Sequence, residues 1–202
     1  MTLREFDEQY RQKGCSMLCG VDEAGRGPLA GPVYAAAVIL PPDIQIAGIN
    51  DSKKLSEKKR ELLYEEIKAV ALAFCVAAAS EAEIDEINIL NASFLAMKRA
   101  VQGLSVNSDY VLVDGNIAPD FGMSAEPVIK GDALSESIAA ASVLAKVERD
   151  NYMRKMAELY PHYMFEKHKG YPTKLHYERL DEFGPSDIHR MSFLKKWAAG
   201  KK

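Results

Sequence analysis

Short apolar runs of strand length alternate along this chain with longer segments whose apolar residues recur at helical spacing. Short runs rich in β-branched residues and bounded by glycine or proline are typical of strands, whereas apolar residues three and four positions apart indicate amphipathic helices. Alternation of the two patterns predicts an α/β fold. The strands are expected over Met17–Asp22, Val33–Leu40, Leu72–Ala79, Tyr110–Asp114 and Pro127–Asp132.

The helical pattern appears five times. Helices are expected over Thr2–Gly14, Leu55–Val70, Ile84–Gly103 (as one helix or two), Ala133–Tyr160 and Lys174–Phe183. Ser56 is the expected N-cap of the second helix, and Pro161 ends the fourth. The chain shows no internal repeat or linker, so residues 1–202 predict a single domain in which about 161–202 form a helical C-terminal lobe.

Acidic side chains stand at the ends of three apolar runs: Asp22 with Glu23, then Asp114, then Asp132. In open α/β sheets the carboxyl ends of the strands form the ligand site, so these acids are expected to meet there. Mg²⁺ takes carboxylate oxygens together with water and substrate phosphate. Four acids around two ions about 3.5–4 Å apart would match a two-metal phosphodiester site.

Each acid also has a simpler interpretation. Asp114 could belong only to a turn with the glycine that follows it, and Asp132 could be only the N-cap of the long helix. Asp22 and Glu23 could cap a hairpin and pair with Arg26. The arrival of acids at three separate strand ends favours one shared site over three independent explanations.

The turn after the first acidic pair contains three glycines, two prolines and Arg26 between positions 25 and 32. Gly25 and Gly27 can adopt positive φ and expose bare backbone to a close ligand. Backbone donors and an arginine suit an anion, whereas the neighbouring carboxylates suit a cation. The combination indicates phosphate chemistry.

Several lysines are candidates for phosphate contacts. Lys53 and Lys54 lie in a loop before a helix, where solvation of a helix face does not explain them. Lys169 precedes a glycine and Tyr171, and such a combination of charge, flexibility and an aromatic ring can follow and stack on a nucleic-acid backbone. Together with Lys146, these lysines are expected to form a basic rim.

Other polar residues are expected at the surface. Lys58–Arg60 fit a solvated helix face. The four histidines have no recognisable ligand spacing, and His162, His176 and His189 are expected to be surface residues, whereas the role of His168 stays open.

Composition narrows the class of protein. A chain of 202 residues with 48% hydrophobic and 27% charged residues is typical of a globular domain, and its net charge of −3 argues against general coating of nucleic acid. Three cysteines give neither a disulfide framework nor a zinc-ligand pattern. No apolar stretch approaches 18 residues and the N-terminus lacks a signal-peptide core, so we expect a cytoplasmic protein without a membrane segment.

The ordered motifs resemble those of type 2 ribonuclease H, the bacterial ribonuclease HII family. The resemblance runs from about Met17 to Phe193, nearly the whole chain. Any single block is modest evidence, whereas the ordered set is very specific. The matching blocks are Asp22–Val33, Asn50–Leu55, Val113–Gly115, Lys130–Asp132, Ser137–Asp150, His168–Tyr171, Gly184–Ser186 and His189–Phe193.

The resemblance implies a ribonuclease H-like fold with a mixed five-stranded sheet flanked by helices. It also implies an Mg²⁺- or Mn²⁺-dependent endonuclease, and we expect the protein to be a monomer. Such an enzyme cleaves the RNA strand of RNA–DNA hybrids and incises duplex DNA on the 5′ side of single embedded ribonucleotides, leaving 5′-phosphate and 3′-hydroxyl ends.

The family's functional residues can be placed on this sequence one by one. Its ribose-reading glycine–arginine–glycine falls on Gly25, Arg26 and Gly27, and its stacking tyrosine falls on Tyr171. Its catalytic and metal-binding acids fall on Asp22, Glu23, Asp114 and Asp132, the same four that the strand ends indicate.

Two other classes of protein remain as alternatives. Another metal-dependent nuclease or strand transferase of the same fold would cleave all-DNA duplexes, and the glycine–arginine–glycine turn argues against it. A hybrid-binding protein without activity would bind but not turn over, and the presence of all four acids argues against that. Nucleophilic serine catalysis is disfavoured because no Ser/His/acid arrangement is recognisable.

Overall fold

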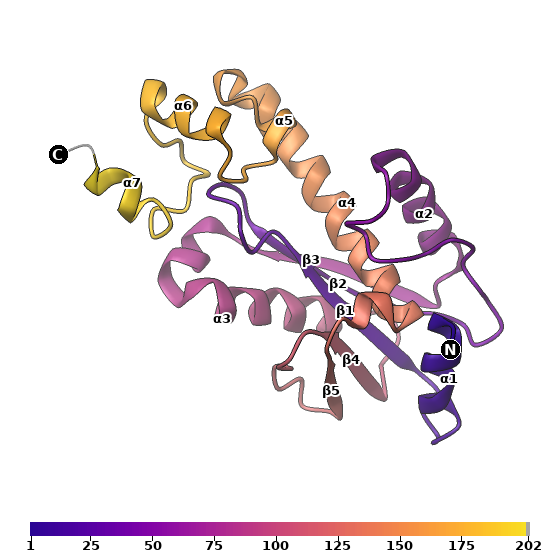
Figure 1. Ribbon diagram of the computed structural model, residues 1–202. Helices are drawn as coiled ribbons and strands as arrows, with labels where there is room; N and C mark the ends of the chain where they lie inside the picture. Colours follow the sequence, from indigo (N-terminus) through magenta and orange to yellow (C-terminus); the bar gives the residue numbers. More distant parts are fainter. Residues whose placement is uncertain (201–202) are drawn as a thin grey trace.

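The computed structural model describes residues 1–200, in which helices flank a central sheet (Figure 1). The five strands are β1 (Leu18–Ala24), β2 (Val33–Ile39), β3 (Ala73–Ala79), β4 (Tyr110–Asp114) and β5 (Ala125–Val128). The α-helices are α1 (Leu3–Arg11), α2 (Glu57–Val70), α3 (Glu81–Gln102), α4 (Glu136–Leu159), α5 (Phe165–His168), α6 (Lys174–Phe183) and α7 (Lys195–Ala199). Two short 3₁₀ helices, η1 (Gly131–Ala133) and η2 (Pro161–Tyr163), precede and follow α4.

The strands form one mixed sheet in the order β3-β2-β1-β4-β5. Strands β1, β2 and β3 form an antiparallel meander, whereas β4 and β5 add to β1 in parallel. Because β1 and β4 are parallel neighbours, their carboxyl ends lie at the same edge of the sheet. The expected mixed five-stranded sheet is confirmed.

The two faces of the sheet are covered by different helices. Side chains of alternate β1 residues, Cys19 and Val21, pack with α3, as strand geometry requires. The opposite face packs against α2 and the alanine-rich start of α4. Gly20 makes this approach possible, because a Cβ atom there would lie 2.1 Å from the Ser137 carbonyl carbon of α4.

The structure corrects one strand boundary that bears on the site. The fifth strand ends at Val128, and Asp132 lies beyond it in η1, which Lys130 enters with φ 58°. Asp132 therefore does not stand at a strand end. It is not the N-cap of the long helix either, because Ser135 takes that position and accepts a hydrogen bond from the Ile138 N–H.

The segment expected as one helix or two is α3, in which two helical halves meet at a kink. Asn88 has φ 67° and ψ 165°, which interrupts the helical backbone. Its Oδ1 accepts hydrogen bonds from the N–H groups of Leu90 and Asn91, so the second half of α3 begins with its own cap.

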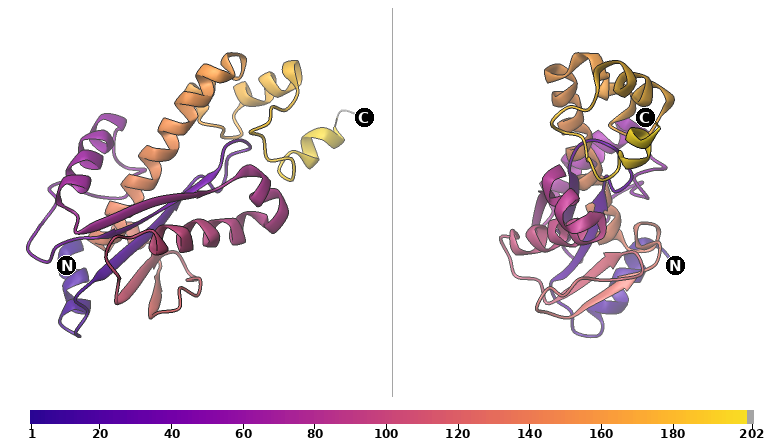
Figure 2. Two further views of the ribbon diagram at one scale, coloured as in Figure 1. Left: turned by 180° about the vertical axis from the view of Figure 1, so that it is seen from behind. Right: turned by 90° about the vertical axis from the view of Figure 1, so that its left-hand side faces the viewer.

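Helix α4 extends past the sheet, the C-terminal helices α5 and α6 lie near its far end, and α7 lies farther from α4 (Figures 1 and 2). This part of the chain contains a small buried cluster around Phe165 and Tyr163. Two expectations for surface histidines are wrong here: His176 is fully buried and His189 is 3% exposed, and only His162 is exposed as expected. Among the described residues, no helix combines the length and apolar character needed to cross a membrane.

Candidate active site

Three aspartates converge where β1 and β4 end. Asp22 lies two residues before the end of β1, Asp114 is the last residue of β4, and Asp132 approaches from η1. One carboxylate oxygen from each lies within 4.8 Å of the other two. The Asp132 N–H points at Asp114 Oδ1 over 3.4 Å, which ties η1 to the strand.

Asp22 is the most deeply placed of these acids, only 3% exposed. Burial raises its pKa well above the ordinary range, and the nearby charges of Glu23 and Asp114 raise it further. Hydrogen bonds from Ser142 and from the Glu23 N–H oppose this effect without cancelling it. Burial and like charges thus outweigh the hydrogen bonds that Asp22 accepts, which is the situation that a bound cation relieves.

Glu23 follows Asp22 on β1 but is not one of the three converging side chains. Burial raises the pKa of Glu23, whereas the Arg26 guanidinium lowers it. The Arg26 Nη1 and Glu23 Oε1 atoms are 3.6 Å apart, so the pairing considered from the sequence does exist. Asp114 also acts on Glu23 electrostatically, which links it to the aspartate group.

Asp132 has a different charge environment. Burial raises its pKa, and the charges of Asp114 and Asp51 add to this effect, whereas Lys53 lowers it. The Lys53 Nζ lies 3.9 Å from Asp132 Oδ2. Asp51 was not singled out from the sequence as a site residue, because its pairing with the aspartate group depends on how the loop before α2 folds.

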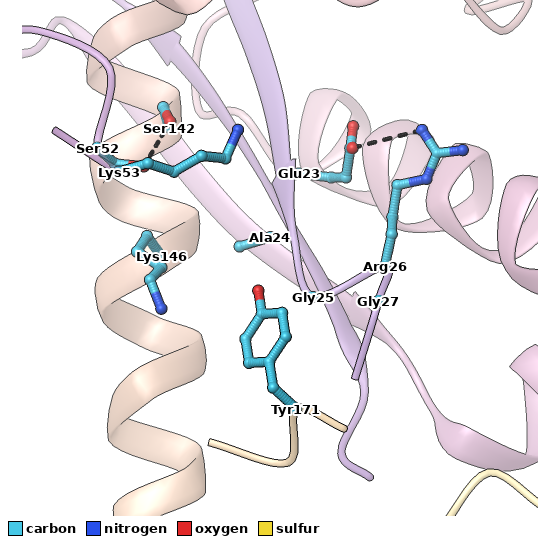
Figure 3. A pocket seen from close by; sticks show the side chains of 10 residues that line it. All are labelled: Glu23, Ala24, Gly25, Arg26, Gly27, Ser52, Lys53, Ser142, Lys146 and Tyr171. Atoms are coloured by element: carbon cyan, nitrogen blue, oxygen red, sulfur yellow. Dashed lines mark hydrogen bonds and ion pairs between the residues drawn. The ribbon is translucent and has the colours of Figure 1, made fainter. Parts of the chain in front are cut away.

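A pocket of about 240 Å³ opens beside Glu23 (Figure 3). The turn that follows β1 forms one wall, and α4 with the loop before α2 forms the other. Tyr171 projects into the space between them (Figure 3). The pocket is lined by Glu23, Ala24, Gly25, Arg26, Gly27, Ser52, Lys53, Ser142, Lys146 and Tyr171.

The two glycines of the glycine–arginine–glycine turn are needed for different reasons. Gly25 has φ +101°, and a Cβ atom there would lie 2.1 Å from Arg149 Nε. Gly27 has an unstrained backbone, and a Cβ atom there would meet only the Tyr171 ring at 3.8 Å. Gly25 is thus required by the fold of the turn, whereas Gly27 leaves space in the pocket.

Two buried arginines hold this turn by hydrogen bonds to its carbonyls, and neither role is indicated by the residues around them in the sequence. The Arg190 guanidinium donates to the carbonyls of Gly25 (2.6 Å), Arg26 (3.1 Å) and Gly31 (2.8 Å). Arg149 donates to the carbonyls of the same turn and to that of Lys169 (3.1 Å). In the sequence, Arg149 looks like part of the charged outer face of a long helix, yet it is fully buried.

Tyr171 is 40% exposed, and its ring lies 5.6 Å from the Arg149 guanidinium carbon. The preceding residues are fixed to the turn, because the Leu29 N–H donates to the Gly170 carbonyl over 2.8 Å. A cation beneath the ring favours one ring position. The structure therefore places an accessible aromatic face opposite the glycine–arginine–glycine turn.

The lysines expected in the basic rim differ in availability. The side chains of Lys53 and Lys54 are 76% and 64% exposed. Lys146 lines the pocket, but its Nζ binds Asp150 Oδ1 over 2.7 Å and burial lowers its pKa. Lys169 Nζ donates to the Glu166 carbonyl over 2.6 Å. Among the lysines expected to contact phosphates, Lys53 and Lys54 have the most exposed side chains and the longest ion-pair contacts.

Two serines complete the wall opposite the turn. Ser52 Oγ and Ser142 Oγ lie 2.8 Å apart, and both residues are buried. Ser142 also contacts Asp22. Neither serine was identified from the sequence, since their proximity joins the loop before α2 to the middle of α4.

The donor set in this site suits a hard divalent cation. Three carboxylate oxygens converge, one of the acids is deeply buried, and among the described residues this group contains no thiol or imidazole. Oxygen donors of this kind are preferred by Mg²⁺ and Mn²⁺. The β3-β2-β1-β4-β5 sheet with converging acids at the ends of its central parallel strands defines a metal-dependent nuclease of the ribonuclease H-like class.

Comparisons with known proteins agree with this class and narrow it. The family model for ribonuclease HII matches residues 19–196. Ribonuclease HII of Caldicellulosiruptor bescii is 54% identical over 191 residues, covering 95% of this chain and 93% of the relative. That of Shewanella pealeana is 58% identical over 186 residues, covering 92% of each. The chain belongs to the ribonuclease HII family.

Solved structures show the same relationship. The ribonuclease H2 of Pyrococcus horikoshii superposes with a TM-score of 0.72 at 26% identity, over 87% of this chain and 92% of the other. The ribonuclease HII of Archaeoglobus fulgidus, solved in complex with PCNA, gives 0.69 at 27% identity over 87% and 94%. As a member of this family, the protein is a metal-dependent endoribonuclease that acts on RNA–DNA hybrids, and incision at ribonucleotides fits the family.

Proposed function

We propose that the protein incises duplex DNA on the 5′ side of single embedded ribonucleotides, as well as cleaving RNA in longer hybrids, and leaves 5′-phosphate and 3′-hydroxyl ends. The observation that carries this proposal is the position of the aspartate group beside a pocket walled by the glycine–arginine–glycine turn and Tyr171. Carboxylates that can hold cations therefore lie next to a pocket that can take a sugar.

In this proposal Asp22, Asp114 and Asp132 hold divalent cations directly, and Glu23 acts as the fourth catalytic acid from the same strand. These acids would hold Mg²⁺ or Mn²⁺, and the chemistry supplied there would be activation of a water and neutralisation of charge on the leaving oxygen. A ribonuclease HIII of 16% identity and TM-score 0.62 was solved with Mn²⁺, and its similarity here concerns the fold. The protein's own contribution is to orient the scissile phosphate between the acids and the basic rim.

The pocket residues account for discrimination between RNA and DNA. A 2′-hydroxyl is both a donor and an acceptor, and it distinguishes ribose from deoxyribose. Gly25, Arg26 and Gly27 can bring backbone groups close to it, because the buried arginines hold the turn's carbonyls on the inner side. Tyr171 stacks on the neighbouring sugar, where a deoxyribose leaves more room than a ribose.

The basic rim binds the backbone of the duplex in this proposal. Lys53 and Lys54 contact phosphates directly, and Lys146 and Lys169 contribute at either side of the pocket. One copy of the chain contains all of these residues, so the working unit is a monomer. Its substrate is genomic DNA with misincorporated ribonucleotides, which places its work in the cytoplasm.

Cleavage of end-labelled duplexes with zero, one or four ribonucleotides, in Mg²⁺ and in Mn²⁺, tests the proposal. We expect no cleavage of the all-DNA duplex and a single cut 5′ of the lone ribonucleotide. Cleavage of all-DNA duplexes would instead indicate a general nuclease. Cutting of the four-ribonucleotide substrate alone would remove the single-ribonucleotide part of the proposal.

A further inference from the structure

Three buried histidines lie beneath the segment that carries Tyr171, and none has a part in the chemistry proposed above. His168, His176 and His189 are 6%, 0% and 3% exposed. The rings of His168 and His176 are stacked with centroids 4.3 Å apart. The ring nitrogens Nε2 of His176 and His189 are 3.0 Å apart. Buried polar rings that contact one another need a defined set of hydrogens.

The hydrogen-bond partners determine those hydrogens. The Tyr171 carbonyl only accepts, so the Nδ1 of His176, 3.0 Å away, carries a hydrogen and donates it. The Ser186 N–H donates to Nδ1 of His189 over 2.9 Å, so that nitrogen carries none. The hydrogen of His189 is therefore on Nε2, and it is donated to Nε2 of His176.

The result is a directed chain of hydrogen bonds from Ser186 through His189 and His176 to the backbone of Tyr171. Every donor in this chain meets an acceptor, and both rings are neutral. It joins the loop after α6 to the segment that enters the pocket.

His168 fixes the same segment from its other side. Its Nε2 donates to the Tyr163 carbonyl over 2.9 Å, and its Nδ1 accepts from the Gly170 N–H over 3.2 Å. Its own carbonyl accepts from the Tyr171 N–H over 2.8 Å. The backbone of residues 170–171 is thus held on both sides by the histidine rings.

We infer that His176 is a positioning residue, which holds the backbone of Tyr171 through its Nδ1–H and thereby fixes the ring in the pocket. The inference rests on the proposed stacking role of Tyr171. The Tyr171 carbonyl also accepts from the Thr173 N–H over 2.8 Å, so His176 shares this tether with a local backbone contact. The Tyr171 side chain is 40% exposed, and the Arg149 guanidinium is the charged group that lies against its ring. Loss of the backbone tether should therefore be transmitted to the ring position.

An added proton on the His176 ring or the His189 ring would remove a hydrogen-bond acceptor and break the chain of hydrogen bonds. Burial, followed by the neighbouring histidines, lowers the pKa of both His176 and His189 to about 4. Within the described chain, the charged groups that act on His168 are Glu166, which raises its pKa, and Lys169, which lowers it alongside burial. The rings are therefore neutral at neutral pH, as the hydrogen-bond chain requires.

Two nearly isosteric variants of His176 separate its hydrogen bond to Tyr171 from its hydrogen bond with His189. His176→Asn keeps an amide N–H near the position of Nδ1 and loses the contact with His189. His176→Gln keeps a polar group near Nε2 and loses the donor to Tyr171. His176→Leu removes both, and His162→Leu is the matched control because His162 is the exposed histidine of the same region.

The readout is junction preference: the cleavage rate on a single-ribonucleotide duplex divided by that on a continuous RNA–DNA hybrid. We expect His176→Gln and His176→Leu to lower it by about fivefold, the effect of one net hydrogen bond. His176→Asn should restore most of it, and His162→Leu should leave it unchanged. Equal preference in the Asn and Gln variants would overturn the inference, since a general packing role does not distinguish them.

Tyr171→Ala, alone and combined with His176→Leu, separates this inference from the proposed function. If Tyr171→Ala lowers junction preference and the second change adds nothing further, His176 acts through Tyr171. If Tyr171→Ala has no effect, the proposed stacking role is wrong. If Tyr171→Ala lowers the preference and His176→Leu alone does not, stacking stands and the positioning role of His176 is wrong.

NMR of the unmodified enzyme gives a test that does not depend on how variants fold. Ring N–H signals that exchange slowly with solvent are expected from Nδ1 of His176, Nε2 of His189 and Nε2 of His168 at neutral pH. The exposed His162 should give no such signal. A hydrogen on Nδ1 of His189, or none on Nδ1 of His176, would contradict the proposed direction of the chain.

Discussion

Asp22 shows how much a single residue at this site depends on its surroundings. It lies in a strand whose neighbours are apolar, yet it is nearly fully buried and faces Glu23 and Asp114. Such a position is unfavourable for an ionised group in the metal-free protein. The same position would become favourable if Asp22 shared a cation with Asp114 and Asp132.

The raised pKa of Asp22 gives a prediction about stability. A carboxyl group whose pKa is higher in the folded than in the unfolded state lowers folding stability as pH rises above the unfolded value, about 3.9. In EDTA at neutral pH, Asp22→Asn should therefore be more stable than the unmodified protein, and the difference should shrink on acidification. Thermal unfolding across pH measures this. A difference that grows on acidification would show that Asp22 is held ionised.

Asp114→Asn tests the role of the acids in catalysis. The change removes one charged oxygen donor from the converging group but leaves the basic rim intact. Loss of residues that only support metal ligands costs about 10–100-fold, so loss of this acid should cost more than about a hundredfold in cleavage rate. Hybrid affinity in Ca²⁺ should stay within a few-fold. Wild-type turnover in Mg²⁺ would show that the site is assigned wrongly.

At the scale of elements, the turn between β1 and β2 depends on residues far away in sequence. Arg149 comes from α4 and Arg190 from the segment before α7, and both donate to carbonyls of this turn. The carbonyl dipoles help to stabilise the two buried charges, and the Glu81 carboxylate acts favourably on both arginines. Burial, together with the charge of Arg149, lowers the pKa of Arg190 to about 9.

The two glycines of this turn should respond differently to alanine. Gly25→Ala forces φ +101° on a residue with a Cβ and collides with Arg149, so it should destabilise the fold by about 1–3 kcal/mol. Gly27→Ala meets only ordinary contact and should change stability by no more than about 0.5 kcal/mol. Its cost should appear in cleavage of ribonucleotide-containing duplexes.

Denaturant unfolding and cleavage assays on both variants give the comparison, in which each glycine is the control for the other. Normal cleavage by Gly27→Ala would show that this position does not approach the sugar. Unchanged stability of Gly25→Ala would show that the turn can move away from Arg149.

At the scale of the whole molecule, the net charge of −3 conceals an uneven distribution. Acids gather at the ends of β1 and β4, while Lys53 and Lys54 project beside them with mostly exposed side chains. A local cationic rim can bind a phosphate backbone although the protein as a whole is acidic. The structure distinguishes the four lysines by their availability to phosphate, which the sequence could not do, because Lys146 forms an ion pair with Asp150.

Salt dependence of hybrid binding measures this rim. Each phosphate contact contributes about 0.9 to the slope of log affinity against log salt. Changing Lys53 and Lys54 together to Gln should therefore reduce the slope by about 1.8. Lys13→Gln, at the opposite end of β1, should leave it unchanged. An unchanged slope in the double variant would return both lysines to the role of solvated surface residues.

Local signals account for what was predicted correctly. The β-branched run Tyr110–Asp114 and the cap at Ser56 are read from neighbouring residues, and both occur as expected. The strand boundary near Asp132 was wrong because a left-handed residue, Lys130, ends the extended backbone early. Nothing in the local sequence distinguishes that outcome from a strand that continues four residues further, to Asp132.

The sequence by itself determined the alternation of strands and helices and indicated the four candidate acids and the glycine–arginine–glycine turn, because these depend on residue type and short-range spacing. Only the tertiary structure decided that Arg149, His176 and His189 are buried, and that Ser52 meets Ser142. The physical reason is that burial of a polar side chain depends on partners supplied by other elements. Those partners are set by how α4 and the C-terminal helices pack against the turn after β1.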